Sequence, residues 1–354
     1  MRKELEVNKN LIASCYPAMG VGLGILQSHQ EMDEWVYNHF LQIFSTDEQT
    51  IDFYDFNVSC CPFIDYGELK LDVVKQLNFE KFIDEMIDNN YYLSFFVDTQ
   101  KIKAYGTKMG LHPIFIYGYD NEKGVFLSAD HFTRGIFSFK EIDKEEVINA
   151  MVQNEEIKRI EQRFRWDYKT IQYYRFDPYR HKTKVKLQEC EYGTYIDCKQ
   201  IRDGILAYIE ARPCLNVCAR MLDVPQSVYK RTYWGKDTYR ILQEYVQDLK
   251  DKNQKPKMGI QGFYVMYVYK KIMSKRLYYL AKKGYVDVEK ELLKNMEELE
   301  KEAYLICLLF IKKFIDNKNA TEGEINSLVK KLEIMKGREL RLYEKMMRKL
   351  DTSV

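Results

Sequence analysis

Proline and glycine are scarce in this sequence, with 7 and 17 residues among 354. Chains that form long disordered linkers are usually rich in such residues, so we expect folded structure along most of the length. The start, MRKELEVNKN, lacks the apolar stretch of a secretory signal, and the longest apolar run covers only residues 304–311, too few to cross a membrane. These absences predict a cytoplasmic protein without a membrane partner.

An excess of charge of one sign is absent as well. Lysine and arginine number 55 and aspartate and glutamate 53, so the composition predicts no nucleic-acid partner. Eight cysteines are scattered without a signal peptide, which favours reduced thiols over a disulfide framework. The group Cys190, Cys198, Cys214, Cys218 and His181 does not match zinc-site spacing, and no P-loop or complete dinucleotide fingerprint occurs. We therefore expect neither a metal nor a bound cofactor.

Two regions with different periodicity follow one another along the chain. Residues 1–200 mix helical and β-rich segments, including an amphipathic segment at 80–89 and β-rich runs at 91–98 and 135–139. Apolar residues in 201–354 recur at helical spacing, as in the series Leu292, Met296, Leu299, Ala303, Ile306 and Phe310. The patterns predict an α+β fold, with one domain over 1–200 and a mainly helical domain over 201–354.

Cys15 directly precedes a segment, 17–29, that we expect to be helical. Pro17 suits the first turn of a helix, where its missing N–H costs nothing. A thiol at a helix N-terminus is favoured as the thiolate by the backbone dipoles, which makes Cys15 a candidate nucleophile. The alternative is a small buried apolar residue, the usual role of a cysteine outside disulfides. Three glycines in the same segment, at 20, 22 and 24, suggest close backbone packing in the core.

His112 and Asp130 lie at the two ends of a predicted β-hairpin. The runs PIFIYGY and VFLSAD flank the turn DNEKG, and Pro113 favours extended backbone at His112. With a three-residue loop, His112 faces Phe132 and Asp130 is its diagonal neighbour on the same face. A two-residue turn points Asp130 away, and a five-residue loop pairs it directly with His112. Diagonal and direct pairs both allow an imidazole–carboxylate hydrogen bond. The alternatives are a surface histidine and a turn aspartate, and a register slip of one residue makes His131 the base.

The order of these residues resembles a known family. The chain has a cysteine before a helix, then a histidine at a strand start, then an acid at the end of the next strand. This order, and the run HPIFIYGYDNEKGVFLSADHF that contains the histidine and the acid, resemble papain-like, C39-type cysteine enzymes. The run is most similar to the N-terminal domain of the butirosin biosynthesis acyltransferase group. It also resembles the thiotemplated amide synthetase of closthioamide biosynthesis. The resemblance covers residues 8–200 and implies a papain-like domain.

The resemblance implies amide-forming acyl transfer in nonribosomal natural-product biosynthesis. Cys15 would take an acyl group from the phosphopantetheine thioester of an acyl or peptidyl carrier protein and pass it to a small amine. His112 would serve as base, with Asp130 orienting it. Papain-like enzymes place a glutamine before the nucleophile to bind the oxyanion, and no glutamine precedes Cys15. Asn10 is the substitute we select, and this departure argues against ordinary peptidase activity.

Two further readings of the sequence use the same residues or another segment. A cysteine peptidase or thioesterase could use the same triad. A non-catalytic binding protein, or a DNA-linked regulator, could use residues 214–235, which have a helix-turn-helix pattern with Lys230 and Arg231 in the second helix. Two smaller features are a vicinal pair, Cys60 and Cys61, and a basic cluster over 180–186 that could contact an acidic carrier protein.

Overall fold

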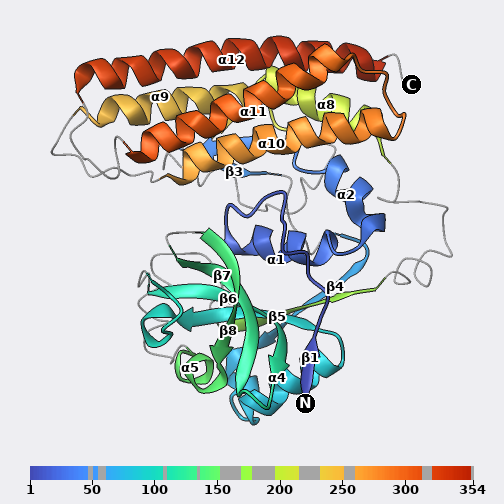
Figure 1. Cartoon of the computed structure of the whole chain (residues 1–354), viewed down its shortest axis with the longest axis vertical. Helices are drawn as coiled ribbons and strands as arrows, with labels where there is room; N and C mark the ends of the chain where they lie inside the picture. The colour runs from blue at the N-terminus through green and yellow to red at the C-terminus, as the bar shows by residue number, and fades with distance from the viewer. Residues whose placement is uncertain are drawn as a thin grey trace. The chain divides into compact units, whose positions relative to one another are not determined.

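The structure is a computed structural model of the whole chain (Figure 1). It describes residues 1–46, 51–54, 61–106, 110–133, 136–151, 169–177, 196–214, 232–250, 260–312 and 321–351. The chain forms two compact units, one made of residues 1–33 and 57–192 and the other of residues 34–56 and 193–354. The protein mixes α and β structure, as its sequence predicts.

An antiparallel sheet forms the centre of the first unit. Its strands are β1 (Arg2–Glu4), β4 (Ile64–Lys70), β5 (Tyr92–Asp98), β6 (Leu111–Asp120), β7 (Val125–Thr133), β8 (Ile136–Asp143) and β9 (Thr170–Phe176). They are ordered β4-β9-β5-β6-β7-β8, and β1 pairs with β6. Helices of this unit are α1 (Pro17–Leu26), α3 (Leu71–Val74), α4 (Phe79–Asp88) and α5 (Lys144–Asn149). The β6–β7 hairpin, whose strands lie side by side in Figure 1, is the one that the sequence predicts.

Helix α1 packs against strands β6 and β7 of this sheet. Pro17 occupies its first turn, and all residues from Met19 to Leu26 are buried. A Cβ added at Gly20 would lie 2.4 Å from the ring of Phe137 on β8, so a side chain at this position would require that ring to move. The close packing expected from the glycine-rich segment therefore occurs at Gly20, and it holds the start of α1 against the sheet.

A β-bulge in β6 sets which side chains share a face near the end of the hairpin. Asp120 pairs with Val125, which leaves a four-residue loop, and this register continues to the pair of Gly118 with Leu127. The register then shifts by one residue, so that Tyr117 is the extra residue and Ile116 pairs with Ser128. Beyond the bulge the register is the one that a three-residue loop would have given. The four-residue loop alone would have turned Asp130 to the opposite face from His112.

Strand β1 lies beside β6 on the turn side of that bulge. Glu4 pairs with Gly118, and the backbone N–H of Leu5 donates to the Tyr117 carbonyl at 2.8 Å. A Cβ at Gly118 would lie 2.6 Å from the backbone oxygen of Lys3, so the strand approaches β6 too closely for any side chain there. Strand β5 pairs with the other part of β6, from Leu111 to Ile116. The bulge thus separates two differently paired parts of one strand.

The second unit is mainly helical. Its helices are α2 (Asp33–Asn38, whose first residue belongs to the first unit), α8 (Cys198–Ile209), α9 (Thr238–Asp248), α10 (Gln261–Lys282), α11 (Lys290–Phe310) and α12 (Glu322–Asp351). The apolar series from Leu292 to Phe310 is buried on α11, as its spacing predicts. Thr321 and Glu324 form reciprocal hydrogen bonds at the start of α12, which is the capping-box arrangement.

A buried ion pair lies in the core of this helical unit. Lys270 on α10 and Glu339 on α12 are both fully buried, with Nζ 3.0 Å from Oε1. The hydroxyls of Tyr208 and Tyr239 donate to Glu339 Oε2 at 3.0 and 2.7 Å. Burial lowers the pKa of Lys270, and the carboxylate of Glu339 partly offsets that effect. The carboxylate therefore has three partners, which compensates for its removal from water.

The observed division of the chain differs from the predicted boundary at residue 200, because the second unit resumes at residue 193 and also includes an earlier segment. Residues 34–56 belong to the helical unit, although they lie far before residue 200. Their strands β2 (Ile43–Thr46) and β3 (Ile51–Phe53) form a small sheet with β10 (Thr232–Trp234), in the order β10-β2-β3. A pairing between segments so distant in sequence leaves no local pattern from which it could be predicted. Among the described residues, no helix combines the length and apolar character that a membrane span requires.

Candidate functional site

His112 and Asp130 are hydrogen-bonded to each other on the β6–β7 hairpin. Nδ1 of His112 lies 2.6 Å from Oδ2 of Asp130. The His112 side chain is 20% exposed, whereas that of Asp130 is fully buried. In the register beyond the Tyr117 bulge the two are diagonal neighbours, which is one of the arrangements that the sequence allowed. The result is an imidazole accessible from solvent with a buried carboxylate behind it.

The carboxylate of Asp130 has a second donor, the hydroxyl of Tyr105, which bonds to the same Oδ2. Burial acts to raise the pKa of Asp130, but the hydrogen bond from His112, the nearby His131 and the bond from Tyr105 together hold it below its usual value. Asp130 is therefore ionised at neutral pH and can only accept hydrogen bonds. It follows that Nδ1 of His112 carries a hydrogen, and Nε2 of the neutral ring is the basic nitrogen.

His131 connects this pair to the segment that carries Cys15. Its Nε2 lies 2.9 Å from the backbone oxygen of Ser14, the residue before Cys15. Its Nδ1 lies 3.5 Å from Oδ1 of Asp130, too long for a good hydrogen bond. Strand β7 has a register shift against β8 between Asp130 and Thr133, and such a shift lets consecutive side chains approach a common site. The sequence presents His131 only as a substitute base.

Cys15 itself lies at the entrance to α1. It is half-buried and is not part of a disulfide. The next residue, Tyr16, has extended backbone, and its carbonyl accepts the first helical hydrogen bonds from Met19 and Gly20. The contact between Ser14 and His131 thus places the cysteine segment next to the Asp130 cluster. A thiol at this end of a helix is exposed to the positive end of the backbone dipoles.

Asn10, predicted as the oxyanion donor, lies in an exposed position. Its backbone N–H donates to the side-chain oxygen of Asn8 at 2.7 Å. Asn8 in turn donates through its side chain to the Gln27 carbonyl, and the Gln27 side chain accepts from the backbone N–H of Ile12. These amides hold the segment before Cys15 onto the end of α1. The described contacts place none of them with His112 and Asp130.

Tyr105 is a site residue that sequence analysis did not identify. This residue comes from the segment between β5 and β6, which has no periodic pattern, and it is 4% exposed. Its ring packs on Phe132 with centroids 4.9 Å apart and lies edge-on to His112. Only the folding of that segment onto β7 brings its hydroxyl to Asp130.

Within the described part of the chain, His112, Asp130 and His131 also form a group able to hold a metal ion. One potential ligand atom from each lies within 4.8 Å of the others. Imidazole nitrogens and a carboxylate oxygen are ligands that zinc and related transition metals accept. The same three side chains are therefore suited to general-base catalysis and to metal binding.

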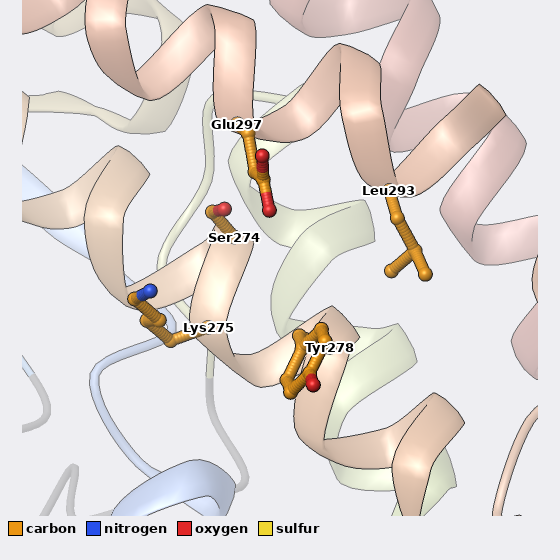
Figure 2. A pocket seen from close by; sticks show the side chains of 5 residues that line it. All are labelled: Ser274, Lys275, Tyr278, Leu293 and Glu297. Carbon is orange, nitrogen blue, oxygen red and sulfur yellow. The ribbon is translucent and has the colours of Figure 1, made fainter. Parts of the chain in front are cut away.

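A separate hollow lies on the surface of the helical unit, between α10 and α11 (Figure 2). It has a volume of about 360 Å³ and is lined by Ser274, Lys275, Tyr278, Leu293 and Glu297. Figure 2 shows Ser274, Lys275 and Tyr278 on one helix and Leu293 and Glu297 on the other. Tyr278 is 53% exposed, so the hollow is open to solvent. It contains none of the residues that the sequence selects for chemistry.

Several sequence features fall outside the described residues. They are Cys60, Cys190, Cys218, His181, the basic cluster over 180–186 and most of the helix-turn-helix pattern, 215–231. Comparison with protein-family models and with curated proteins found no match for this chain.

Proposed function

We propose that this chain is a papain-like cysteine acyltransferase that forms amides from carrier-bound thioesters. The observation that carries the proposal is the hydrogen bond of the accessible His112 to the buried, ionised Asp130, beside the segment that holds Cys15. A base, an orienting acid and a thiol segment are the parts that nucleophilic catalysis by cysteine requires. The choice of substrate rests on the resemblance of the hairpin to the butirosin and closthioamide enzymes.

In the first half-reaction the Cys15 sulfur attacks the thioester carbonyl of the acyl group on a carrier protein. Nε2 of His112 accepts the thiol proton, and Asp130 stabilises the imidazolium through Nδ1. The tetrahedral intermediate then collapses, and the bond from carbonyl carbon to the phosphopantetheine sulfur breaks. The departing thiolate takes the proton from His112, so the products are the free pantetheine thiol and an acyl-Cys15 thioester.

In the second half-reaction an amine attacks the acyl-Cys15 carbonyl. Nε2 of His112, again neutral, takes a proton from the attacking nitrogen. The bond from carbon to the Cys15 sulfur then breaks and the proton returns to the thiolate. A thioester is reactive enough for this exchange without ATP, provided that water does not reach the acyl-enzyme first. Hydrolysis through the same acyl-enzyme would make the protein a thioesterase or a peptidase.

Intact-mass spectrometry of the full chain with acyl-pantetheine thioesters tests the nucleophile. We expect the wild-type protein to gain the mass of one acyl group and Cys15→Ala to gain none. Cys198→Ala is the matched control, because Cys198 is another half-buried cysteine at a helix start. Burial and the neighbouring Asp197 raise its pKa, so it should contribute no acylation. A mass gain that survives in Cys15→Ala, or none in the wild type with any thioester, would contradict the proposal.

The acyl-enzyme then separates the competing activities. Adding small amines should release the acyl group as an amide, faster than it is lost to water. Faster loss to water with every amine tested would identify a thioesterase, and cleavage of peptides would identify a peptidase. Asp130→Asn should slow acylation by about 10²- to 10⁴-fold, the range that a positioned base contributes.

A further inference from the structure

Two buried polar atoms at this site face each other without a hydrogen-bond partner among the described residues. They are Oδ1 of Asp130 and Nδ1 of His131, and they lie 3.5 Å apart. Asp130 is fully buried and His131 is 8% exposed. Burying polar atoms without partners is costly, so something of matching chemistry should lie between them.

The hydrogen-bond pattern sets the character of both atoms. The Ser14 carbonyl can only accept, so Nε2 of His131 carries the hydrogen of that bond. In the neutral ring Nδ1 then presents a lone pair. The Asp130 carboxyl group receives the hydrogen bonds from Tyr105 and His112 at Oδ2, and its Oδ1 also presents lone pairs. The two atoms are therefore both acceptors, and a cation between them would satisfy both.

The separation of these atoms fits a metal ion better than a proton. An N–H···O hydrogen bond spans about 2.7–3.2 Å, so 3.5 Å is long for a shared proton. Nitrogen and oxygen ligands lie about 2.0–2.2 Å from zinc. At a tetrahedral angle, two such ligands are separated by about 3.3–3.5 Å. The observed separation corresponds to that arrangement.

Supporting hydrogen bonds of the kind found around metal ligands are also present. A ligating histidine usually donates its other ring N–H to a carbonyl or carboxylate, as His131 does to Ser14. The carboxylate ligand is itself usually hydrogen-bonded, as Asp130 is to Tyr105 through Oδ2. His112 belongs to the same group, in which each of the three residues offers one potential ligand atom within 4.8 Å of one from each of the others.

We propose that His131, Asp130 and His112 bind a divalent transition metal such as Zn²⁺ at this position. The ligand atoms are Nδ1 of His131, Oδ1 of Asp130 and Nδ1 of His112. To ligate, Nδ1 of His112 must lose its proton and its hydrogen bond to Asp130. Metal binding and the oriented base therefore exclude each other. The metal would switch off the chemistry of Cys15, and this regulatory consequence alone rests on the proposed acyl transfer.

Titration of the chelator-treated full chain with Co²⁺, a spectroscopic substitute for Zn²⁺, tests the site without any substrate. We expect visible ligand-field bands that saturate at one equivalent, disappear on adding Zn²⁺, and are absent in His131→Gln. Tyr105→Phe should retain the bands with about 10- to 100-fold weaker affinity, the usual effect of losing a hydrogen bond to a ligand. His29→Gln, which removes a histidine elsewhere in the same unit, should bind as the wild type does.

Cys15→Ser separates this inference from the proposed function. It should abolish acylation and leave the Co²⁺ bands unchanged, because Cys15 is not in the ligand set. Loss of the bands in Cys15→Ser would overturn the ligand set. No bands in the wild type, or equal bands in folded His131→Gln, would overturn the site. If His131→Gln does not fold, Asp130→Asn replaces it. If acylation fails in the wild type while Co²⁺ binds, the metal site stands and the proposed function falls.

Discussion

Replacing Tyr105 by phenylalanine removes one hydroxyl from the buried carboxylate of Asp130 and leaves the aromatic ring in place. The lost interaction is a hydrogen bond to an ionised acceptor, which typically stabilises a protein by about 1.5–3 kcal/mol. Because the ring keeps its packing on Phe132, little apolar contact is lost. We therefore expect Tyr105→Phe to lower the free energy of unfolding by about 1.5–3 kcal/mol at neutral pH.

The pH dependence makes this prediction specific to the carboxylate. The hydrogen bond from Tyr105 helps to lower the pKa of Asp130 in the folded protein. A lowered pKa stabilises the fold above the pKa of the unfolded chain, and that stabilisation is lost as pH falls through the folded pKa. Removing the bond raises the folded pKa. The stability difference between variant and wild type should thus be full at neutral pH and smaller at acid pH.

Urea unfolding of the wild type and Tyr105→Phe, repeated from neutral to acid pH, measures this difference. Tyr92→Phe is the matched control, because Tyr92 is equally buried but donates to a neutral acceptor, the Glu6 carbonyl, at 2.6 Å. Its loss should be about 0.5–1.5 kcal/mol and independent of pH. Equal losses at both tyrosines with no dependence on pH would refute the view that Tyr105 stabilises an ionised Asp130.

Three further predictions concern other parts of the molecule. Burial lowers the pKa of His39 from 6.5 to about 4, so only the unfolded chain takes up a proton between these values. Stability should therefore fall by about 2 kcal/mol on acidification to about pH 5, and His39→Gln should remove that slope in urea unfolding. Glu339→Gln should cost about 3–5 kcal/mol by leaving Lys270 without its counter-charge, and adding Lys270→Met should recover most of it. Gly118→Ala should cost about 1–3 kcal/mol and speed amide exchange in β1, because its Cβ meets Lys3.

The sequence predicts much of the fold because its strongest signals are local. The turn at 120–124, the helix after Pro17 and the buried series on α11 each follow from residues close together in the chain. The boundary of the helical unit does not, because β2 pairs with β10 across almost two hundred residues. Long-range pairing of this kind is decided by tertiary packing and leaves no periodic pattern.

The site shows the same division between local and non-local signals. The proximity of His112 and Asp130 could be predicted from the hairpin. The register that aligns them depends on the loop length and on the bulge at Tyr117 together. Tyr105 could not be predicted, because only the fold of an irregular segment brings it to Asp130. Asn10 was predicted as the oxyanion donor from its distance along the chain from Cys15. In the structure the backbone N–H of Asn10, not its side chain, takes part in a local turn with Asn8.

The β6–β7 hairpin contains two one-residue shifts that cancel: its four-residue loop and its extra residue at Tyr117. Each shift alone would move the following side chains to the opposite face of the sheet, and together they leave the face unchanged. Deleting Tyr117 alone would turn Asp130 away from His112, and so would removing one residue from 121–124 alone. Deleting both should restore the pairing at the far end of the hairpin. Functional relatives whose loop differs by one residue should therefore also differ by one residue at the bulge, so that a gap in one place identifies the gap to look for in the other.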